Sequence, residues 1–345
     1  MRGGRQSEQA LIEKIRQAAA LPYRKPSTEQ VRLGIGDDAA LFRPKTGYET
    51  TLTCDWFLEG THFIKERHPP DAVGWKCLAR ALSDIAAMGG VPRCFLLSLA
   101  LPASCTGPWL DSFLGGLRRA SRKSGCVLAG GDTTRSGKIL INVTVVGEVP
   151  VGRATLRSGA RPGDIIYVSG HLGEAELGLR ILREEKRLAR RGDLRIRKHL
   201  YPEPRLALGQ WLAKKQLVSA MMDLSDGLSL DLARLCAASH VGARVQATQV
   251  PAVRVPATRG LRGVDLMMLA LHGGDDYELL FTVSRRSVGQ IPSSFEGLRL
   301  TAIGKITLGG QTIASGEISR GRQVLLVQKD GKTEPLMARG WDPFR

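Results

Sequence analysis

Short apolar segments of β-like composition alternate with longer segments of helical periodicity along the whole chain, and this alternation limits the folds open to it. In residues 71–90, apolar side chains recur at helical spacing, and Gly89 and Gly90 supply a stop signal. Residues 139–149 are rich in β-branched side chains, which favour strands. Strand-loop-helix units in both halves predict a mixed α/β protein of the α+β type.

Residues 150–164 are dense in Gly, Pro and Arg and are typical of a boundary between domains. A chain of 345 residues is long enough for two ordinary domains. We therefore predict an N-terminal domain over 1–149 and a C-terminal α/β domain over 150–345. Further helices are expected over 8–20, 107–124, 173–190 and 204–215 and from about Ser225, and strands over 48–55, 95–102, 126–131, 165–170, 242–250 and 277–283.

The composition is that of a folded globular protein, with 43% hydrophobic residues. The longest apolar runs, such as "CFLLSLALP", are too short to span a bilayer, and the N-terminus carries charges where a signal peptide needs an apolar stretch. Six cysteines occur without a CxxC pair or a histidine at metal spacing, which predicts reduced thiols and no zinc site. We expect a cytoplasmic protein that has no membrane partner.

The net charge is +17, which favours contact with polyanions such as nucleic acid, a membrane surface or nucleotide phosphates. The richest stretch, residues 179–200, has nine Lys and Arg and three acids, without interleaved aromatic residues. That pattern favours a solvated helix and loop over a nucleic-acid-binding face, so nucleic acid is not an expected partner.

Aspartates recur beside glycine or where apolar segments end. A single aspartate of this kind is commonly a turn former or a helix N-cap, and Ser225 and Asp226 are placed to cap the helix that follows. The whole set together predicts a cation-binding site, because carboxylates that converge at strand ends repel one another unless a cation lies among them. Oxygen ligands without His or Cys indicate Mg²⁺. The apolar segments end at Asp38, Asp55, Asp132, Asp223 and Asp275.

Magnesium held by carboxylates suggests phosphoryl transfer, in which the protein supplies position and electrostatic field. The chain has no GxxxxGK[ST] loop and no protein-kinase motif set. "GIGDD" begins like a dinucleotide fingerprint, but it lacks the third glycine and places two acids where a pyrophosphate would lie. The common nucleotide-binding classes are therefore excluded.

Eight motifs occur in order from about residue 7 to 344. They are "GIGDDAALF", "TCDWFLEGTHF", "KCLARALSDIAAMGG", "GGDTTR", "RSGARPGD", "DLSDGLSLDL", "GGDDYELLFTV" and "GWDPF". Together they resemble the thiamine-monophosphate kinases of the aminoimidazole ribonucleotide synthetase superfamily. This resemblance implies direct transfer of the γ-phosphate of ATP onto thiamine monophosphate with several Mg²⁺ ions, giving thiamine diphosphate without a phosphoenzyme. It also implies a homodimer whose N-terminal sheets pair into a shared barrel.

The same resemblance implies roles for individual residues. Asp38, Asp132, Asp223 and Asp226 are the implied catalytic acids, and Asp37 is a weaker neighbour. The implied metal ligands are Asp38, Thr53, Cys54, Asp55, Asp84, Asp132, Asp223 and Asp226. The implied ATP contacts are Gly131, Asp132, Arg157 and Ser225, and those to thiamine monophosphate are His62, Asp275 and Trp341.

Several of these assignments leave alternatives open. Cys54 stands where the family commonly has Ser or Thr, and a thiol is a poor Mg²⁺ ligand, so its backbone is the expected contact. Trp341 either stacks on the thiazolium of thiamine or anchors the C-terminus by packing, and His62 either contacts substrate or closes a loop. In the motif "GWDPF", Pro343 stands where the family often has His, which leaves the substrate contact at this motif open.

Relatives with the same fold remain alternatives for the activity. Selenophosphate synthetases and the hydrogenase maturation relative use a reactive Cys or selenocysteine, and none of the six cysteines matches those positions. An aminoimidazole ribonucleotide synthetase is compatible with the fold but fits "GIGDD" and "GGDDYE" less well. A non-catalytic polyanion binder would leave the acidic motifs unexplained.

Overall fold

The computed structural model describes residues 8–19, 30–35, 38–184, 189, 192–253, 264–314, 317–321, 323–342 and 344. The chain forms two compact units, each with its own core. The N-terminal unit comprises Met1–Ile85, Gly90–Gly152 and Leu182–Leu206, and the C-terminal unit comprises Ala86–Gly89, Arg153–Ile181 and Ala207–Arg345. Both units are therefore discontinuous in sequence, and the simple division between residues 149 and 150 stays a prediction.

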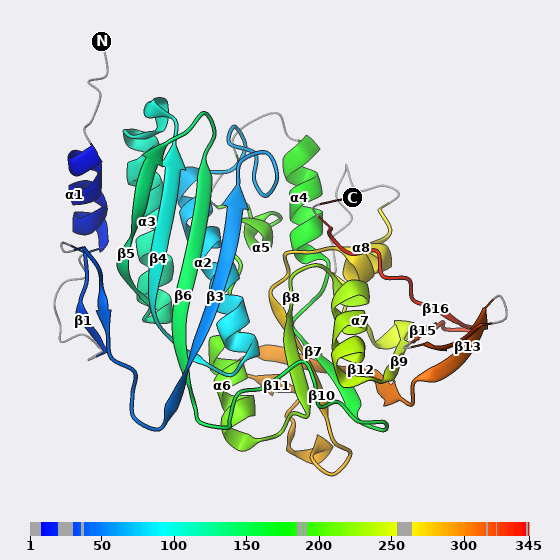
Figure 1. The fold of residues 1–345 in the computed structure, drawn as a ribbon. Coiled ribbons are helices and arrows are strands. Elements are labelled where there is room, and N and C mark those ends of the chain that lie inside the picture. Colours follow the sequence, from blue (N-terminus) through cyan, green and yellow to red (C-terminus); the bar gives the residue numbers. More distant parts are fainter. Residues whose placement is uncertain are drawn as a thin grey trace. The chain divides into compact units, whose positions relative to one another are not determined.

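A four-stranded sheet forms the centre of the N-terminal unit, in the order β3-β6-β4-β5. Neighbouring strands are antiparallel except for the parallel pair β4–β5. Helices α2 and α3 cover one face of this sheet (Figure 1) and supply much of the core. The strands are β3 (Tyr48–Leu58), β4 (Val91–Leu101), β5 (Val127–Arg135) and β6 (Leu140–Pro150), and the helices are α2 (Pro70–Ala87) and α3 (Pro108–Ser124).

The opposite face of this sheet is open within the described chain. Along β3, side chains alternate between the faces, so Phe57 is buried while Leu52 and Trp56 are 70% and 55% exposed. Leu96 on β4 adds a third exposed apolar side chain. A monomeric protein rarely exposes a contiguous apolar surface of this kind, so the open face is a candidate contact surface.

Smaller elements complete the N-terminal unit. The buried Glu148 of β6 accepts hydrogen bonds from Gln30 Nε2 at 2.7 Å and from the Lys45 backbone N–H at 2.8 Å, and it pairs with Arg93 Nε at 3.0 Å. This carboxylate therefore holds both ends of the segment that contains β1 and β2. The elements are α1 (Glu8–Ala19), β1 (Val31–Leu33), β2 (Leu41–Phe42), a 3₁₀ turn (Ala103–Cys105) and α5 (Arg197–Leu200).

The C-terminal unit contains a mixed eight-stranded sheet in the order β16-β15-β9-β12-β7-β10-β8, with β11 paired to β12. Strands β15 and β9 are parallel, and the other pairs are antiparallel. The strands are β7 (Ile165–Ser169), β8 (Ala220–Leu224), β9 (Gly242–Gln246), β10 (Glu278–Val283), β11 (Ser294–Phe295), β12 (Leu298–Thr307), β15 (Val324–Val327) and β16 (Thr333–Pro335).

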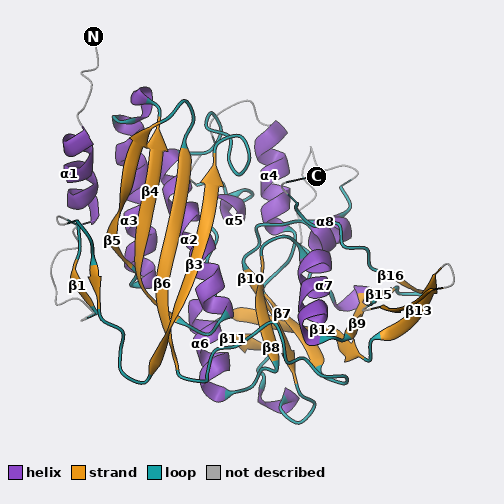
Figure 2. Ribbon diagram, viewed as in Figure 1, coloured by secondary structure: helices purple, strands orange, loops and turns teal. Residues whose placement is uncertain are grey.

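Helices of the C-terminal unit pack their apolar residues into a second core with the sheet (Figure 2). Helix α8 begins at Asp265, whose carboxylate accepts hydrogen bonds from the N–H groups of Met267 and Met268. A separate hairpin is formed by β13 and β14. The remaining bounds are α4 (Glu174–Glu184), α6 (Leu206–Lys215), α7 (Leu228–Ser239), α8 (Leu266–His272), β13 (Gly310–Ala314) and β14 (Glu317–Gly321), with 3₁₀ turns at Ala247–Gln249 and Val288–Gln290.

The structure confirms the mixed α/β, α+β fold class and most predicted elements. The expectation that strands stop at Asp55 and Asp132 is wrong, because β3 continues to Leu58 and β5 to Arg135. Both are edge strands. Asp132 is exposed and pairs with the exposed Ser98 on the open face, whereas Asp55 is half-buried on the face that α2 covers. The helix predicted over 173–190 is α4, which ends at Glu184, and residues 185–188 and 190–191 lie outside the described residues.

The capping role expected for Ser225 and Asp226 is also wrong. Helix α7 begins at Leu228, its N-cap is Gly227, and no side chain caps it. The carboxylate of Asp231, one turn into the helix, accepts the hydrogen bonds of the turn instead. The two predicted cap residues therefore lie in the turn ahead of the helix.

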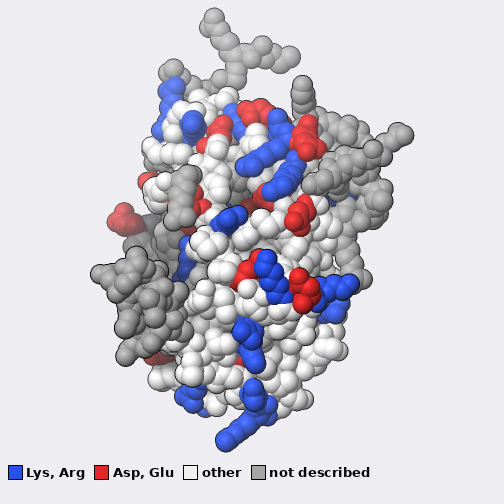
Figure 3. Space-filling model, turned by 90° about the vertical axis from the view of Figure 1, so that its right-hand side faces the viewer, with Lys and Arg blue, Asp and Glu red and all other residues white. Residues whose placement is uncertain are grey.

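Charged side chains are mixed on the surface. On the face drawn in Figure 3, Lys and Arg lie interspersed with Asp and Glu and with uncharged residues. In the basic stretch, Arg180 pairs with Glu176 and Arg195 pairs with Asp193. These acids neutralise part of the local charge, which agrees with the prediction of a solvated helix and loop.

Candidate functional site

Strand β3 and helix α2 bring two predicted metal ligands together. The Thr53 hydroxyl donates a hydrogen bond to the Asp84 carboxylate of α2. Asp55 lies two residues further along β3 and therefore on the same face of the sheet as Thr53. A hydroxyl and two carboxylates on adjoining elements provide the hard oxygen donors that Mg²⁺ prefers.

The Cys54 side chain lies on the other face of β3. Its Sγ is 3.1 Å from Nδ2 of Asn142 on the neighbouring strand β6. The thiol is therefore turned away from the face that carries Thr53 and Asp55. This orientation agrees with the expectation that a contact from Cys54 to a metal uses its backbone.

Gly131 and Asp132 lie in β5 at the other edge of the same sheet. At Gly131, φ is 151°, and a Cβ would lie 1.9 Å from the Leu97 carbonyl oxygen, so only glycine fits. Asp132 is exposed and is paired in register with Ser98. Three strand spacings separate β3 from β5, roughly 14 Å, so Asp55 and Asp132 of one chain cannot bind the same metal ion.

The other predicted residues of the N-terminal unit occupy loops. Asp38 is exposed in the turn between β1 and β2, and Asp37 lies outside the described residues. His62 follows β3, and its Nδ1 accepts a hydrogen bond from the Leu58 backbone N–H at 3.0 Å. In neutral His62 the ring proton is therefore on Nε2, which is the nitrogen suited to donate a hydrogen bond.

A turn between β8 and α7 carries three predicted residues of the C-terminal unit. Asp223 is buried in β8, and Ser225 and Asp226 follow in the turn. The Asp231 carboxylate accepts hydrogen bonds from the N–H groups of Asp226 at 3.0 Å and Gly227 at 3.1 Å. Asp231 itself is fully buried, so this turn is held from inside the unit.

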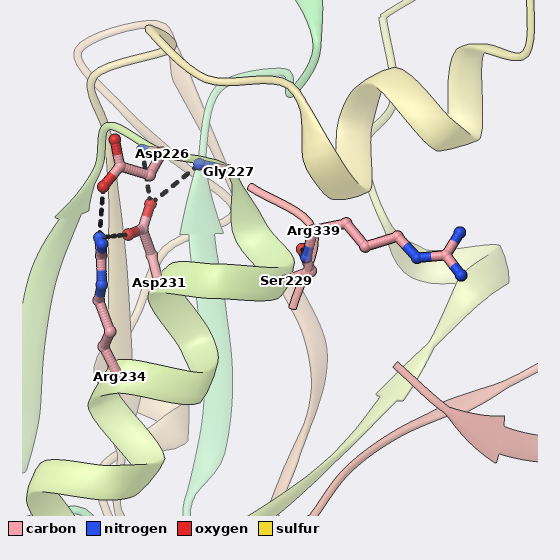
Figure 4. Close-up of polar contacts among 6 residues, drawn as sticks. All are labelled: Asp226, Gly227, Ser229, Asp231, Arg234 and Arg339. Carbon is pink, nitrogen blue, oxygen red and sulfur yellow. Dashed lines mark hydrogen bonds and ion pairs between the residues drawn. The ribbon is translucent and has the colours of Figure 1, made fainter. Parts of the chain in front are cut away.

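Arg234 links the two acids of this turn. Figure 4 shows its guanidinium bound to the Asp226 carboxylate and to the Asp231 carboxylate, the latter at 2.9 Å. Burial, followed by the charge of Asp226, raises the pKa of the Asp231 carboxyl to about 6, although Arg234 and the backbone N–H of Asp226 lower it. The turn therefore concentrates negative charge, which a cation stabilises.

Two distant segments reach the same turn. The N–H of Asp275 donates to the Ser225 carbonyl at 2.8 Å, and the N–H of Trp341 donates to the Asp226 carbonyl at 2.9 Å. The Trp341 side chain is 43% exposed, so the backbone rather than the packed indole attaches this segment. The structure thus brings Asp223, Ser225, Asp226, Asp275 and Trp341 into one region of the C-terminal unit.

Arg157 lies elsewhere in the C-terminal unit. Its side chain is exposed, and its carbonyl accepts a hydrogen bond from the Ser239 hydroxyl at 2.9 Å. Ser239 is at the end of α7 opposite to the Asp226 turn. The described contacts therefore do not connect Arg157 with Ser225 or Asp226.

Sequence reasoning missed the residues that hold the predicted ones in place. Asp231 and Arg234 are spaced i,i+3 on α7, and this spacing was the one available signal for their pairing. Tyr277, whose hydroxyl donates to Asp275 Oδ1 at 2.7 Å, was present in "GGDDYE" but was not identified. Glu148 lies more than 100 residues from the segment it holds, so no local pattern indicates it.

The side-chain oxygens described above can supply some of the ligands of a magnesium ion, but not a complete set. Within the described ranges, no three or more His, Cys, Asp or Glu side chains form a group that could hold a metal ion. Magnesium nevertheless retains several waters and commonly combines one or two carboxylates with substrate phosphates. In the N-terminal unit, the paired oxygens of Thr53 and Asp84 and the Asp55 carboxylate suit that mode of binding, and in the C-terminal unit the Asp226 carboxylate does.

Four of the six cysteines are buried in surroundings that make them poor nucleophiles. All six are free thiols, and only Cys54 is exposed. Burial raises the pKa of Cys94 to about 11 and that of Cys236 to about 12, and it raises the pKa of Cys77 and Cys126 as well. Thiols with such pKa values are protonated and unreactive near neutral pH.

Comparisons with known proteins agree along nearly the whole chain. Residues 36–149 match the AIR synthase related protein N-terminal domain, and residues 161–317 match the corresponding C-terminal domain. The thiamine-monophosphate kinase of Escherichia coli K12 is 36% identical over 93% of this chain and 94% of that protein. The Bacillus subtilis enzyme of the same name is 36% identical over 74% of this chain and 78% of its own length.

Solved structures give the same result. The thiamine-monophosphate kinase of Stenotrophomonas maltophilia K279a has a TM-score of 0.76 and 36% identity, covering 91% of this chain and 98% of that one. A structure described as AaThiL complexed with AMPPCP and TMP has a TM-score of 0.68 and 31% identity, covering 92% and 96%. The hydrogenase maturation protein HypE, at 20% identity and a TM-score of 0.75, shares the fold. The chain therefore belongs to the AIR synthase related family and, within it, to the thiamine-monophosphate kinases.

Proposed function

We propose that this protein transfers the γ-phosphate of ATP to thiamine monophosphate and produces thiamine diphosphate and ADP, with Mg²⁺. The observation that carries the proposal is the similarity over 92% of the chain to a structure that holds AMPPCP and TMP together. AMPPCP is an ATP in which a methylene group replaces a bridging oxygen. The paired oxygens of Thr53 and Asp84 and the acidic turn at Asp226 support the same reaction.

The reaction needs little proton chemistry from the protein. An oxygen of the thiamine monophosphate phosphate forms a bond to the γ-phosphorus, and the bond from this phosphorus to the bridging oxygen of ADP breaks. The second pKa of a phosphate monoester is about 6, so the attacking oxygen is already deprotonated at pH 7. The absence of an assigned general base among the proposed catalytic residues is consistent with this.

The acids would hold the Mg²⁺ ions that position the anionic substrates and neutralise their charge. In the N-terminal unit, Asp38, Thr53, Cys54 through its backbone, Asp55, Asp84 and Asp132 are the proposed metal ligands. In the C-terminal unit, Asp223 and Asp226 complete the set. Bound Mg²⁺ supplies Lewis-acid stabilisation of the charge that develops on the phosphate oxygens. Asp38, Asp132, Asp223 and Asp226 are the catalytic candidates because they would hold the reacting phosphates through the metal.

The remaining residues are proposed to contact the two substrates themselves. We assign Gly131, Arg157 and Ser225, together with Asp132, to ATP, where Gly131 permits close approach and Arg157 adds positive charge. We assign His62, Asp275 and Trp341 to thiamine monophosphate. The half-exposed indole of Trp341 is able to stack on the cationic thiazolium, a contact of about 0.5–2 kcal/mol.

A homodimer is part of the proposal. Both outer strands of the N-terminal sheet, β3 and β5, are edges in the described chain, and its open face exposes Leu52, Trp56 and Leu96. Pairing with a second copy would cover these side chains and close the sheet into a barrel. It would also bring acids from two chains together, which matters because Asp55 and Asp132 of one chain are too far apart to share an ion.

The location of the reaction is proposed to be the cytoplasm. No helix in the described part of the chain is long and apolar enough to cross a membrane. The support for the cytoplasm is the use of ATP and the six free thiols, which a reducing compartment maintains.

The test is a turnover assay with purified protein, ATP, Mg²⁺ and thiamine monophosphate, in which thiamine diphosphate is measured by chromatography. We expect metal-dependent product that EDTA abolishes. Asp223→Asn should lower kcat at least about a hundredfold, because it removes a charge that would hold Mg²⁺ against the reacting phosphates. Asp330→Asn, at an exposed turn, is the matched control and should retain full activity.

The outcomes separate this proposal from its alternatives. A folded protein that binds ATP but makes no thiamine diphosphate would keep the fold and reassign the substrate to another enzyme of the superfamily. A protein that binds no ATP would exclude the kinase altogether, and strongly salt-dependent polyanion binding would then favour the non-catalytic alternative.

A further inference from the structure

The loop between α8 and β10 has an unfavourable backbone conformation. Asp275 and Tyr277 have φ values of 69° and 51°, in the left-handed region that residues with a Cβ rarely occupy. Conformations of this kind persist only where the surroundings hold them, and they concentrate at functional sites. The loop belongs to the segment that we assign to thiamine monophosphate.

Three sets of hydrogen bonds hold this loop. The N–H of Tyr277 donates to the Leu224 carbonyl at 2.8 Å, and the N–H of Asp275 donates to the Ser225 carbonyl at the same distance. The buried carboxylate of Asp276 accepts from the N–H groups of Gly173 at 2.6 Å and Ala175 at 3.1 Å. The backbone of the loop is thus tied both to the turn that carries Asp226 and to the start of α4.

The side chain of Asp275 receives its own support from Tyr277. The Tyr277 hydroxyl donates to Asp275 Oδ1 at 2.7 Å, and the Tyr277 ring is only 2% exposed. A buried ring cannot follow a mobile carboxylate, so the hydroxyl defines one orientation for Asp275. A carboxylate in a defined orientation suits thiamine, which offers a cationic thiazolium and the amino group of its pyrimidine.

We propose that Tyr277 is a positioning residue, which orients the Asp275 carboxylate toward the thiamine portion of the substrate. The inference rests on the proposed function and deepens it, because it identifies the group that sets the affinity for thiamine monophosphate. The buried Tyr277 contacts Asp275 and affects the substrate only through this carboxylate. The hydrogen bond from the Tyr277 hydroxyl to the charged Asp275 carboxylate also restricts the Asp275 side chain before substrate binds. Less conformational entropy is therefore lost on binding.

The test is Tyr277→Phe, which removes one hydroxyl and keeps the buried ring. We expect KM for thiamine monophosphate to rise about tenfold, the size expected for loss of a hydrogen bond to a charged group, with kcat and KM for ATP within about twofold of wild type. Tyr167→Phe is the matched control. Its ring is also buried and stacks on Phe281 with 5.4 Å between centroids, and its removal of a hydroxyl should leave all three constants unchanged.

A double-mutant cycle distinguishes positioning from general support of the fold. If Tyr277 acts through Asp275, Tyr277→Phe should have no further effect on KM in an Asp275→Ala background. A lower melting temperature with unchanged KM, or equal effects in both backgrounds, would overturn the inference. If wild-type protein makes no thiamine diphosphate, the proposed function fails and the inference fails with it. If wild type is active and Tyr277→Phe retains its KM, only the inference fails.

Discussion

Each unit contains a buried carboxylate that holds a segment with a candidate catalytic acid. The two carboxylates differ in how close to that acid their hydrogen bonds are. Asp231 of the C-terminal unit accepts hydrogen bonds from the backbone of Asp226 itself and of the next residue. Glu148 of the N-terminal unit holds Gln30 and Lys45, which lie well to either side of Asp38. Asp226 is therefore positioned directly, whereas Asp38 depends on the intervening hairpin of β1 and β2.

This difference indicates how each half contributes to the reaction. The C-terminal unit provides a turn whose geometry is complete within the chain, because Asp231, Arg234, Asp275 and Trp341 all attach to it. The N-terminal unit instead arranges its acids through strand register, and they lie at both edges of an open sheet. We therefore expect its proposed site to depend more strongly on metal, substrate and a second copy of the chain.

Removal of Asp231 should have the largest effect on stability. Asp231→Ala leaves the N–H groups of half-buried Asp226 and buried Gly227 without their acceptor and removes one of the two partners of Arg234, so we expect about 3 kcal/mol of destabilisation in urea unfolding. Asp265→Ala is the matched control, because Asp265 also accepts two backbone N–H groups but is exposed at a helix N-cap. It should cost about 1 kcal/mol. Equal losses would show that burial of Asp231 has no special effect.

Glu148→Gln should have an intermediate effect that reaches Asp38 only indirectly. Loss of the charge weakens the bonds to Arg93, Gln30 and Lys45, for an expected cost of about 2 kcal/mol. We also expect a higher Mg²⁺ concentration for half-maximal activity, since the Asp38 hairpin loosens. Glu49→Gln, at an exposed residue that accepts one N–H from Gly152, should change neither quantity. A Mg²⁺ requirement that does not change in Glu148→Gln would contradict the proposed dependence of Asp38 on its hairpin.

Disruption of the open sheet face tests whether the N-terminal site needs a second copy. Leu52→Lys places a charge where the dimer would bury an apolar side chain. A symmetric interface would contain this charge twice. The dissociation constant of the dimer should therefore rise at least a hundredfold, on the order of 3 kcal/mol. The folded chain itself should lose no more than about 0.5 kcal/mol, because Leu52 is exposed in it. Light scattering measures the molar mass of the protein in solution and thus its oligomeric state. Leu308→Lys serves as the control, because Leu308 is also highly exposed but lies in the other unit. A wild-type protein that is monomeric at assay concentrations would exclude the dimer.

Arg234→Met should have the smallest effect on stability. The side chain is 42% exposed, so solvent screens its ion pairs with Asp226 and Asp231, and we expect a loss of about 1 kcal/mol that shrinks in high salt. Arg180→Met, which removes an exposed pair with Glu176, should cost about half as much or less. A loss above about 3 kcal/mol would show that Arg234, rather than Asp231, holds the turn.

Local features of the amino-acid sequence determined much of the fold. The helical period of residues 71–90 predicted α2, and the β-branched run at 139–149 predicted β6, because periodicity and propensity are local properties. Local reasoning failed where tertiary context changed the outcome. Asp55 and Asp132 look like strand ends in the sequence, yet both lie inside edge strands, Asp132 exposed and Asp55 half-buried beside the residues that face α2.

The candidate acids could likewise be found from their motifs, because each motif is contiguous in sequence. The tertiary structure decided which of them meet and what holds them. Ser225 and Asp275 are 50 residues apart and share a hydrogen bond, and Glu148 holds Lys45 across 103 residues. Such contacts depend on how strands pair and loops close, and neither is encoded in the spacing of nearby residues. The sequence by itself thus determined the elements and the chemistry available, and the fold decided the geometry in which that chemistry is held.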